Sequence, residues 1–227
     1  MKEKLLDAAA DGDIDTLKQL IAEEVDVNDK NEWGETALMC AAMCRHAEVV
    51  KLLLDNGAEV NLKDCEGWTA LTFAVSEDNV EVVELLLENG AKVNLKNNRG
   101  NTAIMDAASN NDHADVVRVL IINGADVNEE NNDGRTALMM AAWYGRVEVV
   151  KLLIDAGADV NLKDIFFGTT ALMITAFVGH AEVVKLLLDN GAMVNLKDEY
   201  GQTALMNAAR FGYAKVIELL KQHGAIE

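Results

Sequence analysis

Three cysteines lie close together near the start of the chain, and their side chains are the most reactive in it. Cys40 and Cys44 are four residues apart, so one helix would carry both on one face, and Cys65 follows later. A thiolate metal site built from these three residues would lack a clear fourth ligand. An odd number of cysteines in one region is also not the pattern of a disulfide framework. We therefore expect neither a metal site nor disulfide bonds here.

The histidines and the search for catalytic motifs give no sign of an enzyme. His46, His113 and His180 recur at equal but wide spacing, too far apart to share one metal ion. The chain has no glycine-rich phosphate loop, no nucleophile elbow and no His-Glu-x-x-His motif. Its many carboxylates show no spacing that would pair them for acid–base work. We predict no catalytic residues, no cofactor and no enzymatic activity.

The composition is strongly acidic. Lys and Arg total 20 against 38 Asp and Glu, which gives a formal net charge of −18. This balance disfavours nucleic acid and anionic membranes as partners, because phosphate binding needs a cationic patch. A basic partner fits the charge, and so does the simpler need of a long surface to stay soluble. No segment reads as a signal peptide or a membrane span, so we expect a cytoplasmic protein.

The chain repeats itself with a fixed period. Thr102-Ala-Ile is one copy of a motif that otherwise reads Thr-Ala-Leu, and a glycine lies two residues before every copy. The other copies begin at Thr36, Thr69, Thr136, Thr170 and Thr203. The glycines are 33 or 34 residues apart. A period of this length indicates a solenoid of stacked units, in which no unit buries its apolar face alone.

The sequence of each unit predicts two helices and a turn. Thr36 can cap a first helix with its hydroxyl, and small and apolar residues follow it over 37–42. A more hydrophobic second helix covers 49–54 and ends before Gly57, since a helix C-terminus favours a left-handed residue. An extended stretch then leads to a type I turn over 64–67, with Asp first and Gly fourth.

These motifs resemble the ankyrin repeat family over essentially the whole chain. The matching stretches are Gly-x-Thr-Ala-Leu-Met-x-Ala-Ala, His-Ala-Glu-Val-Val-Lys-Leu-Leu-Leu-Asp-Asn-Gly-Ala and Val-Asn-Leu-Lys-Asp. The family's Pro is replaced by Ala, and its His, which bridges backbone between repeats, by Thr72 or by Met39, Met105, Met139, Met173 and Met206. The resemblance implies an all-α repeat solenoid of stacked helix-turn-helix units with projecting β-hairpin loops.

The period divides the chain into one domain, 1–227. We expect an N-terminal cap over 1–30, repeats over 31–63, 64–96, 97–130, 131–163 and 164–197, and a C-terminal capping repeat over 198–227. A polar insertion lengthens the third repeat at 109–113, and we interpret it as a longer loop. The resemblance also implies binding through the hairpin tips and the exposed side of the first helices, which together line a concave groove.

Aromatic residues gather at those positions and are absent from the second helices. Because aromatic side chains offer large, stiff contact areas, they favour a protein-binding site. The main predicted patch comprises Arg135, Trp143, Tyr144, Ile165, Phe166, Phe167, Phe177, Tyr200, Arg210 and Phe211. A smaller patch comprises Trp33, Met43 and Trp68. We interpret Phe73, which replaces an aliphatic residue, as packing between repeats rather than binding.

The hairpin at 164–168 is the strongest single clue, because it is one residue longer than the others and carries Ile165, Phe166 and Phe167 at its tip. Exposed apolar residues on a projecting loop indicate that something covers them. That cover is a partner, a second copy of the chain, or a neighbouring aromatic such as Trp143 onto which the loop folds back.

Basic residues recur on the hairpin stems, while acids crowd the second helices and the loops after them. The lysines are Lys30, Lys63, Lys96, Lys163 and Lys197, and Arg99, Arg135 and Arg210 join them toward the groove. The groove is therefore expected to be less acidic than the whole chain. The simpler explanation of the lysines, which we prefer, is that they are a regular feature of the repeat.

The leading prediction is a non-catalytic module that binds another protein, as an inhibitor or as an adaptor. It is expected to be monomeric, with a homodimer through 165–167 as the alternative. A different alternative is a reader of a cationic or methylated peptide tail, since Trp33 lies beside Glu32 and Glu35. The sequence names no partner.

Overall fold

The computed structural model describes residues 1–110 and 114–226. These residues form fourteen helices, in which the first and second helices of successive repeats alternate along the chain. The first helices of the repeats are α1 Lys2–Asp11, α3 Ala37–Met43, α5 Ala70–Ser76, α7 Ala103–Ser109, α9 Ala137–Tyr144, α11 Ala171–Val178 and α13 Ala204–Phe211. The second helices are α2 Ile14–Ala22, α4 Ala47–Asp55, α6 Val80–Glu88, α8 Ala114–Ile122, α10 Val147–Asp155, α12 Ala181–Asp189 and α14 Ala214–Gln222.

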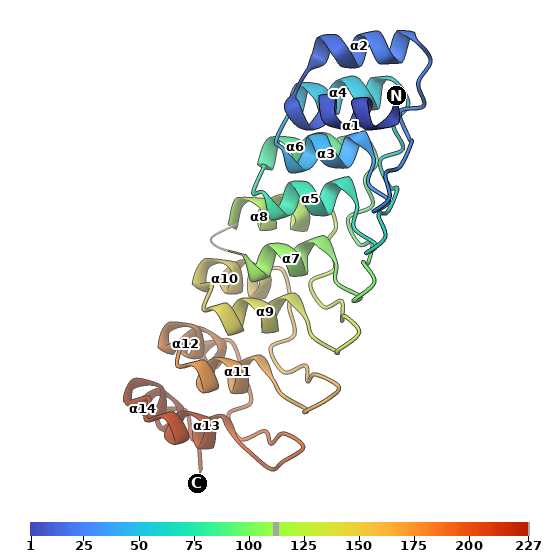
Figure 1. Cartoon of the computed structure of the whole chain (residues 1–227). Coiled ribbons are helices and arrows are strands. Elements are labelled where there is room, and N and C mark those ends of the chain that lie inside the picture. The colour runs from blue at the N-terminus through green and yellow to red at the C-terminus, as the bar shows by residue number, and fades with distance from the viewer. Residues whose placement is uncertain (111–113, 227) are drawn as a thin grey trace. The chain divides into compact units, whose positions relative to one another are not determined.

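The chain divides into two compact units. Unit 1 comprises Met1–Ala107 and Arg118–Ala125, and unit 2 comprises Ala108–Val117 and Asp126–Glu227. Within unit 1, α3 packs against α1 and α5, and α4 packs against α6; within unit 2, α11 packs against α9 and α13, and α12 against α10 and α14. Each unit therefore has a row of first helices and a row of second helices, as Figure 1 shows. The described helices include none of the length and hydropathy that a membrane crossing requires.

The first helices begin at the repeated threonines. The Thr36 hydroxyl accepts a hydrogen bond from the Met39 backbone N–H, and Thr69, Thr136, Thr170 and Thr203 cap their helices in the same way. Met39 Sδ lies 3.4 Å from Thr36 N, so the methionine that replaces the family's histidine closes the cap locally. Small residues behind the caps, such as Ala37, Ala41 and Ala42, are fully buried, which lets neighbouring first helices approach closely.

The second helices bury one apolar stripe. In α4 the buried side chains are Val49, Val50 and Leu53, and the opposite face carries charged residues. Gly57 follows α4 with φ 86°, and a Cβ built there would meet no atom within 4 Å. The backbone conformation alone, rather than crowding, therefore favours glycine at this helix end.

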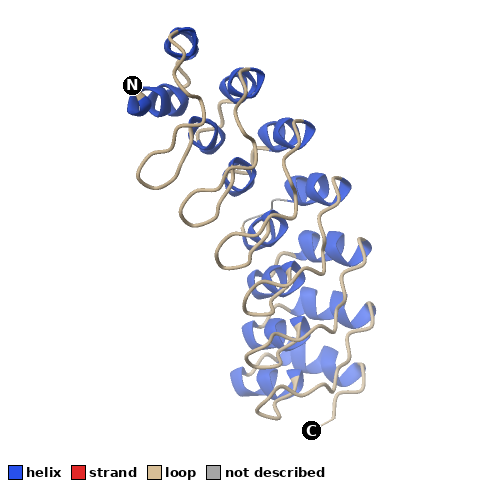
Figure 2. Ribbon diagram, turned by 90° about the vertical axis from the view of Figure 1, so that its right-hand side faces the viewer, coloured by secondary structure: helices blue, strands red, loops and turns tan. Residues whose placement is uncertain are grey.

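The loops between repeats, which we call fingers, are hydrogen-bonded turns. In the first finger Asn31 N donates to Glu35 O and Gly34 N donates to Asn31 O. The Asn31 side-chain oxygen also accepts from the backbone N–H of Trp33 and Glu35. No strand is present among the described residues, and Figure 2 shows the fingers as loops. The expected β-hairpins are therefore tight turns, since each contains too few ladder bonds to count as paired strands.

Regular polar contacts tie one repeat to the next. Lys30 Nζ donates to Lys63 O over 2.8 Å, and Lys63 Nζ to Lys96 O over 2.7 Å. Lys163 and Lys197 are joined likewise in unit 2. Asn28 Nδ2 donates to the carbonyl of Gly57, and the same link recurs at Asn61, Asn94, Asn128, Asn161 and Asn195. These lysines therefore link the backbones of neighbouring repeats.

Candidate functional site

Aromatic side chains of three successive first helices form a continuous row in unit 2. The ring centres of Trp143 and Phe177 are 6.3 Å apart and nearly parallel, and those of Phe177 and Phe211 are 4.8 Å apart in an edge-to-face arrangement. The Phe211 ring in turn stacks on Tyr213 at 6.0 Å. We call Trp143, Phe177, Phe211 and Tyr213 the aromatic row. Its first three members are exposed, Trp143 by 45%, so the row presents a pre-packed apolar surface to solvent.

Two members of the row, Trp143 and Phe177, follow from the repeat itself, whereas Phe211 lies one position later in its repeat. Trp143, Phe177 and Arg210 occupy the same position in their repeats, seven residues after the capping threonine of α9, α11 and α13. Seven residues are close to two helical turns, so these side chains lie on one face of their helices. The opposite faces are buried among small residues such as Ala142. The stacking of repeats therefore aligns the three side chains on neighbouring helices.

A second aromatic cluster lies on the fingers of unit 2. The ring centres of Phe166 and Phe167 are 6.5 Å apart, and those of Phe167 and Tyr200, on the next finger, are 6.2 Å apart. Ile165 packs onto the preceding finger, because a Cβ built on Gly134 would come within 2.5 Å of Ile165 Cγ2. We call Ile165, Phe166, Phe167 and Tyr200 the fingertip cluster. All four are exposed, Phe166 by 61%.

The extra residue changes the turn of this finger. Gly168 N donates to Asp164 O, whereas in the first finger the glycine N–H reaches only three residues back. The buried Asp164 carboxylate accepts from the backbone N–H groups of Phe166 and Phe167. The finger is therefore closed as tightly as the others, and the added apolar residue is held outward. No ring contact joins the described fingertip cluster to Trp143 or Phe177, so the loop does not fold back onto the aromatic row.

Arginines accompany the aromatic residues of unit 2. The Arg210 guanidinium carbon lies 5.6 Å from the Phe211 ring centre, and that of Arg146 lies 5.6 Å from the Tyr144 ring centre. Arg135 is exposed just before the cap of α9. The predicted residues of the main patch thus all lie in unit 2. They fall into two ring-contact clusters, with Arg135 outside both and Tyr144 paired with Arg146 instead.

The smaller patch, in unit 1, is less compact. Trp33 is exposed by 62% and Met43 is exposed at the end of α3. Trp68 is half-buried, with its ring centre 5.5 Å from that of Phe73. No ring contact joins Trp33 to Trp68 in the described part of the chain. Unit 1 therefore pairs Trp68 with Phe73, which is half-buried, and leaves Trp33 separate.

Sequence reasoning overlooked Asp106, on α7 of unit 1. Burial raises the pKa of this carboxyl to about 6, and hydrogen bonding from Asn101 and the charge of Arg99 oppose the rise. Its Oδ1 accepts from Asn101 Nδ2 over 3.3 Å, while its Oδ2 is buried without a hydrogen-bond partner. The signal was visible, because the same position carries Cys40, Phe73, Met140, Ile174 or Asn207 in the later repeats, and its acidic counterpart in α1, Asp7, is exposed.

Cys40, His46 and His180, which were candidates for chemistry from the sequence, lie in surroundings that suit structural roles. Burial, with a smaller contribution from Glu35, raises the pKa of the Cys40 thiol to about 12, so this thiol stays protonated at neutral pH and is a poor nucleophile. His46 Nε2 lies 2.9 Å from Ala10 O, and His180 Nε2 lies 3.1 Å from Trp143 O. These rings therefore bridge to the preceding repeat. His113 and part of the 109–113 insertion lie outside the described residues.

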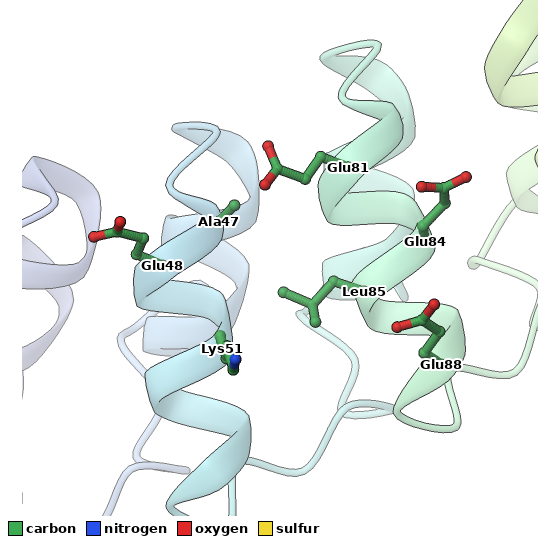
Figure 3. Close-up of a pocket in the computed structure, with 7 residues that line it drawn as sticks. All are labelled: Ala47, Glu48, Lys51, Glu81, Glu84, Leu85 and Glu88. Carbon is green, nitrogen blue, oxygen red and sulfur yellow. The ribbon is translucent and has the colours of Figure 1, made fainter.

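The second helices form the acidic layer that the sequence predicts. A hollow of about 290 Å³ between α4 and α6 is lined by Ala47, Glu48, Lys51, Glu81, Glu84, Leu85 and Glu88. In Figure 3, Leu85 points from α6 toward α4, while Glu48 and Glu84 point away from the gap. The described part of the chain holds no group of three or more His, Cys, Asp or Glu side chains that could bind a metal. The hollow is thus an open surface feature with an acidic rim.

The fold is a stack of two-helix repeats, and unit 2 presents exposed aromatic side chains on its first helices and fingers. A model of ankyrin repeats, in three copies, matches residues 5–97, 91–164 and 161–226, so the chain belongs to the ankyrin repeat family. It is similar to the crystal structure of the human ASB11 ankyrin repeat domain, with 31% sequence identity, 98% of each chain covered and a TM-score of 0.86. None of the curated proteins matches the chain. The predicted fold class is confirmed, and ankyrin repeats are generally protein–protein interaction modules.

Proposed function

We propose that the protein binds a partner protein through the first helices and fingers of unit 2. The observation that carries this proposal is the aromatic row, in which Trp143, Phe177 and Phe211 are exposed yet already packed on one another. Exposed contiguous apolar surface of this kind is typical of interaction sites. The fingertip cluster supplies a second apolar contact on the same unit.

The packing of the aromatic rings on one another before a partner binds favours tight binding. A side chain that must be ordered on association costs about 0.5–1.5 kcal/mol, and rings that already pack on one another lose less freedom. Trp, Tyr and Arg are the residues most enriched among those that dominate interface energies. Trp143 and Arg210 are of these types and lie on the same face of their helices.

A capture experiment tests the proposal. The wild-type protein is compared with the variants Trp143→Ala/Phe177→Ala and Phe166→Ala/Phe167→Ala on cell lysate of the source organism. Loss of two hot-spot side chains should weaken binding by about 30-fold or more, so the captured partner should disappear. Ile122→Ala/Met193→Ala is the matched control, since both residues are exposed and apolar but lie outside the two clusters.

Circular dichroism of each variant separates a lost contact from a lost fold. If both aromatic variants are folded and retain the same partner as the wild type, the proposed surface is wrong. Adding the protein to the identified partner then distinguishes an inhibitor, which lowers the partner's activity, from an adaptor, which leaves it unchanged. Light scattering of the free protein tests the homodimer through 165–167.

The tail-reader alternative has less support. A cage for a methylated cation needs several aromatic faces around one point. Trp33 makes no ring contact in the described structure, and Glu35 Oε2 already accepts from Asn31 Nδ2 over 2.7 Å. The unit 2 surface therefore remains the better candidate.

A further inference from the structure

Four of the second helices are followed directly by an asparagine and then a glycine. The helices are α4, α6, α8 and α12, and the asparagines are Asn56, Asn89, Asn123 and Asn190. All four asparagines and the glycines after them are exposed. Asn-Gly pairs are among the most reactive sites for deamidation in a peptide chain, because glycine has no Cβ to shield its backbone nitrogen. The chain therefore carries the same reactive pair at four equivalent helix ends.

Deamidation of such a pair begins with an attack inside the chain. The backbone nitrogen of the glycine loses its proton and attacks the side-chain carbonyl carbon Cγ of the asparagine. The new C–N bond closes a succinimide ring, and the side-chain amide nitrogen leaves as ammonia. Water then opens the ring at one of its two carbonyl groups, which gives aspartate or isoaspartate. One water is taken up for each ammonia released, so the mass rises by about one dalton and one negative charge is added.

The folded helix ends keep the two reacting groups apart, as the end of α12 illustrates. Asn190 Nδ2 donates to Leu186 O over 2.8 Å. Gly191 N donates to Leu188 O over 3.1 Å. With ψ 25° at Asn190, the Gly191 nitrogen is turned away from Cβ, so ring closure requires a rotation that breaks both hydrogen bonds. The same two bonds recur at the pairs that follow α4, α6 and α8.

The preceding repeat adds a further restraint. Asn161 Nδ2 donates to Gly191 O over 3.2 Å, and Asn161 Oδ1 accepts from Met193 N over 2.8 Å. We call these two bonds the asparagine clamp of Gly191. Rotation about the Cα–C bond before Gly191 moves its carbonyl, so the clamp must open before the succinimide forms. Asn28 and Asn61 clamp the pairs after α4 and α6 in the same way.

We infer that the four Asn-Gly pairs are deamidation sites that the fold keeps unreactive and that the clamp of the preceding repeat controls. Their rate is set by the fraction of time for which the helix end is open. The product carboxylate lies at a helix C-terminus, where the helix dipole disfavours negative charge. It also faces the carbonyl that the amide had satisfied, so each event weakens the helix end on which it occurs. None of these steps requires a bound partner, so the inference stands apart from the proposed function.

Ageing of the full chain tests the protection. The protein is incubated at mildly alkaline pH, once in buffer and once in concentrated urea, and the deamidated fraction at each site is followed by peptide mass spectrometry. Each of the four pairs should react about tenfold or more slowly in the folded chain than in urea, because only the open helix end reacts. Equal rates in the two solutions would overturn the inference.

Asn161→Ala tests the clamp, with the three other Asn-Gly pairs as internal references. The rate at Asn190 should rise by about fivefold, which is the effect of one lost hydrogen bond. Asn128→Ala is the matched control: Asn128 clamps Gly157, which follows Ala156 rather than an asparagine, so this variant should speed none of the four sites. An unchanged rate at Asn190 in Asn161→Ala, or an equal rise in both variants, would show that the clamp does not control the reaction.

Asn28→Ala repeats the clamp test in unit 1 and should speed deamidation at Asn56 alone. It also replaces Asn161→Ala if circular dichroism shows that variant to be unfolded. A rise at all four sites in the folded Asn28→Ala variant would assign the effect to a general loosening of the chain and would contradict control by the clamp.

Discussion

Asp106→Asn is expected to stabilise the protein at neutral pH, because the wild-type carboxylate is held in an unfavourable place. Burial raises the pKa of Asp106 from 3.8 to about 6, and its Oδ2 has no hydrogen-bond partner. Asparagine has nearly the same shape and no charge, and its side-chain oxygen can still accept from Asn101 Nδ2. The substitution therefore removes the cost of the buried charge with little change in packing.

The magnitude follows from the pKa difference between the folded and unfolded chain. A difference of about 2 pKa units corresponds to about 3 kcal/mol, and partial solvent screening together with the cost of burying the amide reduces the expected gain to about 1–3 kcal/mol. The sign is set by proton binding. Between about pH 4 and pH 6 the folded protein binds more protons at Asp106 than the unfolded chain does, so the wild type loses stability as the pH rises through this window. The gain from Asp106→Asn should therefore be near zero at pH 4, grow up to about pH 6 and stay constant above it.

Urea denaturation followed by circular dichroism, repeated between about pH 4 and pH 7 on both proteins, measures the effect. Every other titrating group is shared, so its contribution cancels in the difference between the two curves. Glu81→Gln, an exposed carboxylate on α6, is the control and should change stability by less than about 0.5 kcal/mol. A difference between Asp106→Asn and the wild type that is independent of pH would show that folding leaves the pKa of the Asp106 carboxyl unchanged, and one that falls as the pH rises would show that the folded protein stabilises the carboxylate. The reasoning from burial would then be wrong.

A pair of glycine substitutions and a one-residue deletion test the backbone of unit 2. Gly179→Ala should destabilise the protein more than Gly157→Ala in urea denaturation: both glycines have positive φ, but a Cβ at Gly179 would come within 2.8 Å of the Tyr213 ring, whereas at Gly157 it would meet nothing. Equal losses would show that the ring shifts freely. Deletion of Phe167 should restore the finger length of the other repeats and keep the melting temperature within a few degrees while weakening partner capture, and a collapse of the melting temperature would instead assign the longer finger to stability.

The candidate site was predictable from sequence in its composition but not in its internal arrangement. A repeat places equivalent residues at equivalent positions, so Trp143 and Phe177 could be assigned to one exposed face from their spacing alone. Which rings contact each other could not be predicted, since that depends on the distance and rotation between neighbouring repeats. The structure groups Phe211 with Phe177, and Phe167 with Tyr200, on different elements of the same unit. That these residues bind the partner stays a prediction.

The amino-acid sequence by itself determined the fold class, the helix pattern and the acidic second-helix layer. This was possible because each repeat contacts mainly its neighbours, so a local pattern repeated at a fixed period specifies the whole stack. Only the tertiary structure decided the roles that depend on contacts between repeats. It joined Lys30 to the carbonyl of Lys63, made the fingers turns rather than strand pairs, and left one buried oxygen of Asp106 without a partner. Burial and hydrogen-bond partners arise from side chains some 33 residues apart in sequence, and no local pattern states how closely those side chains meet.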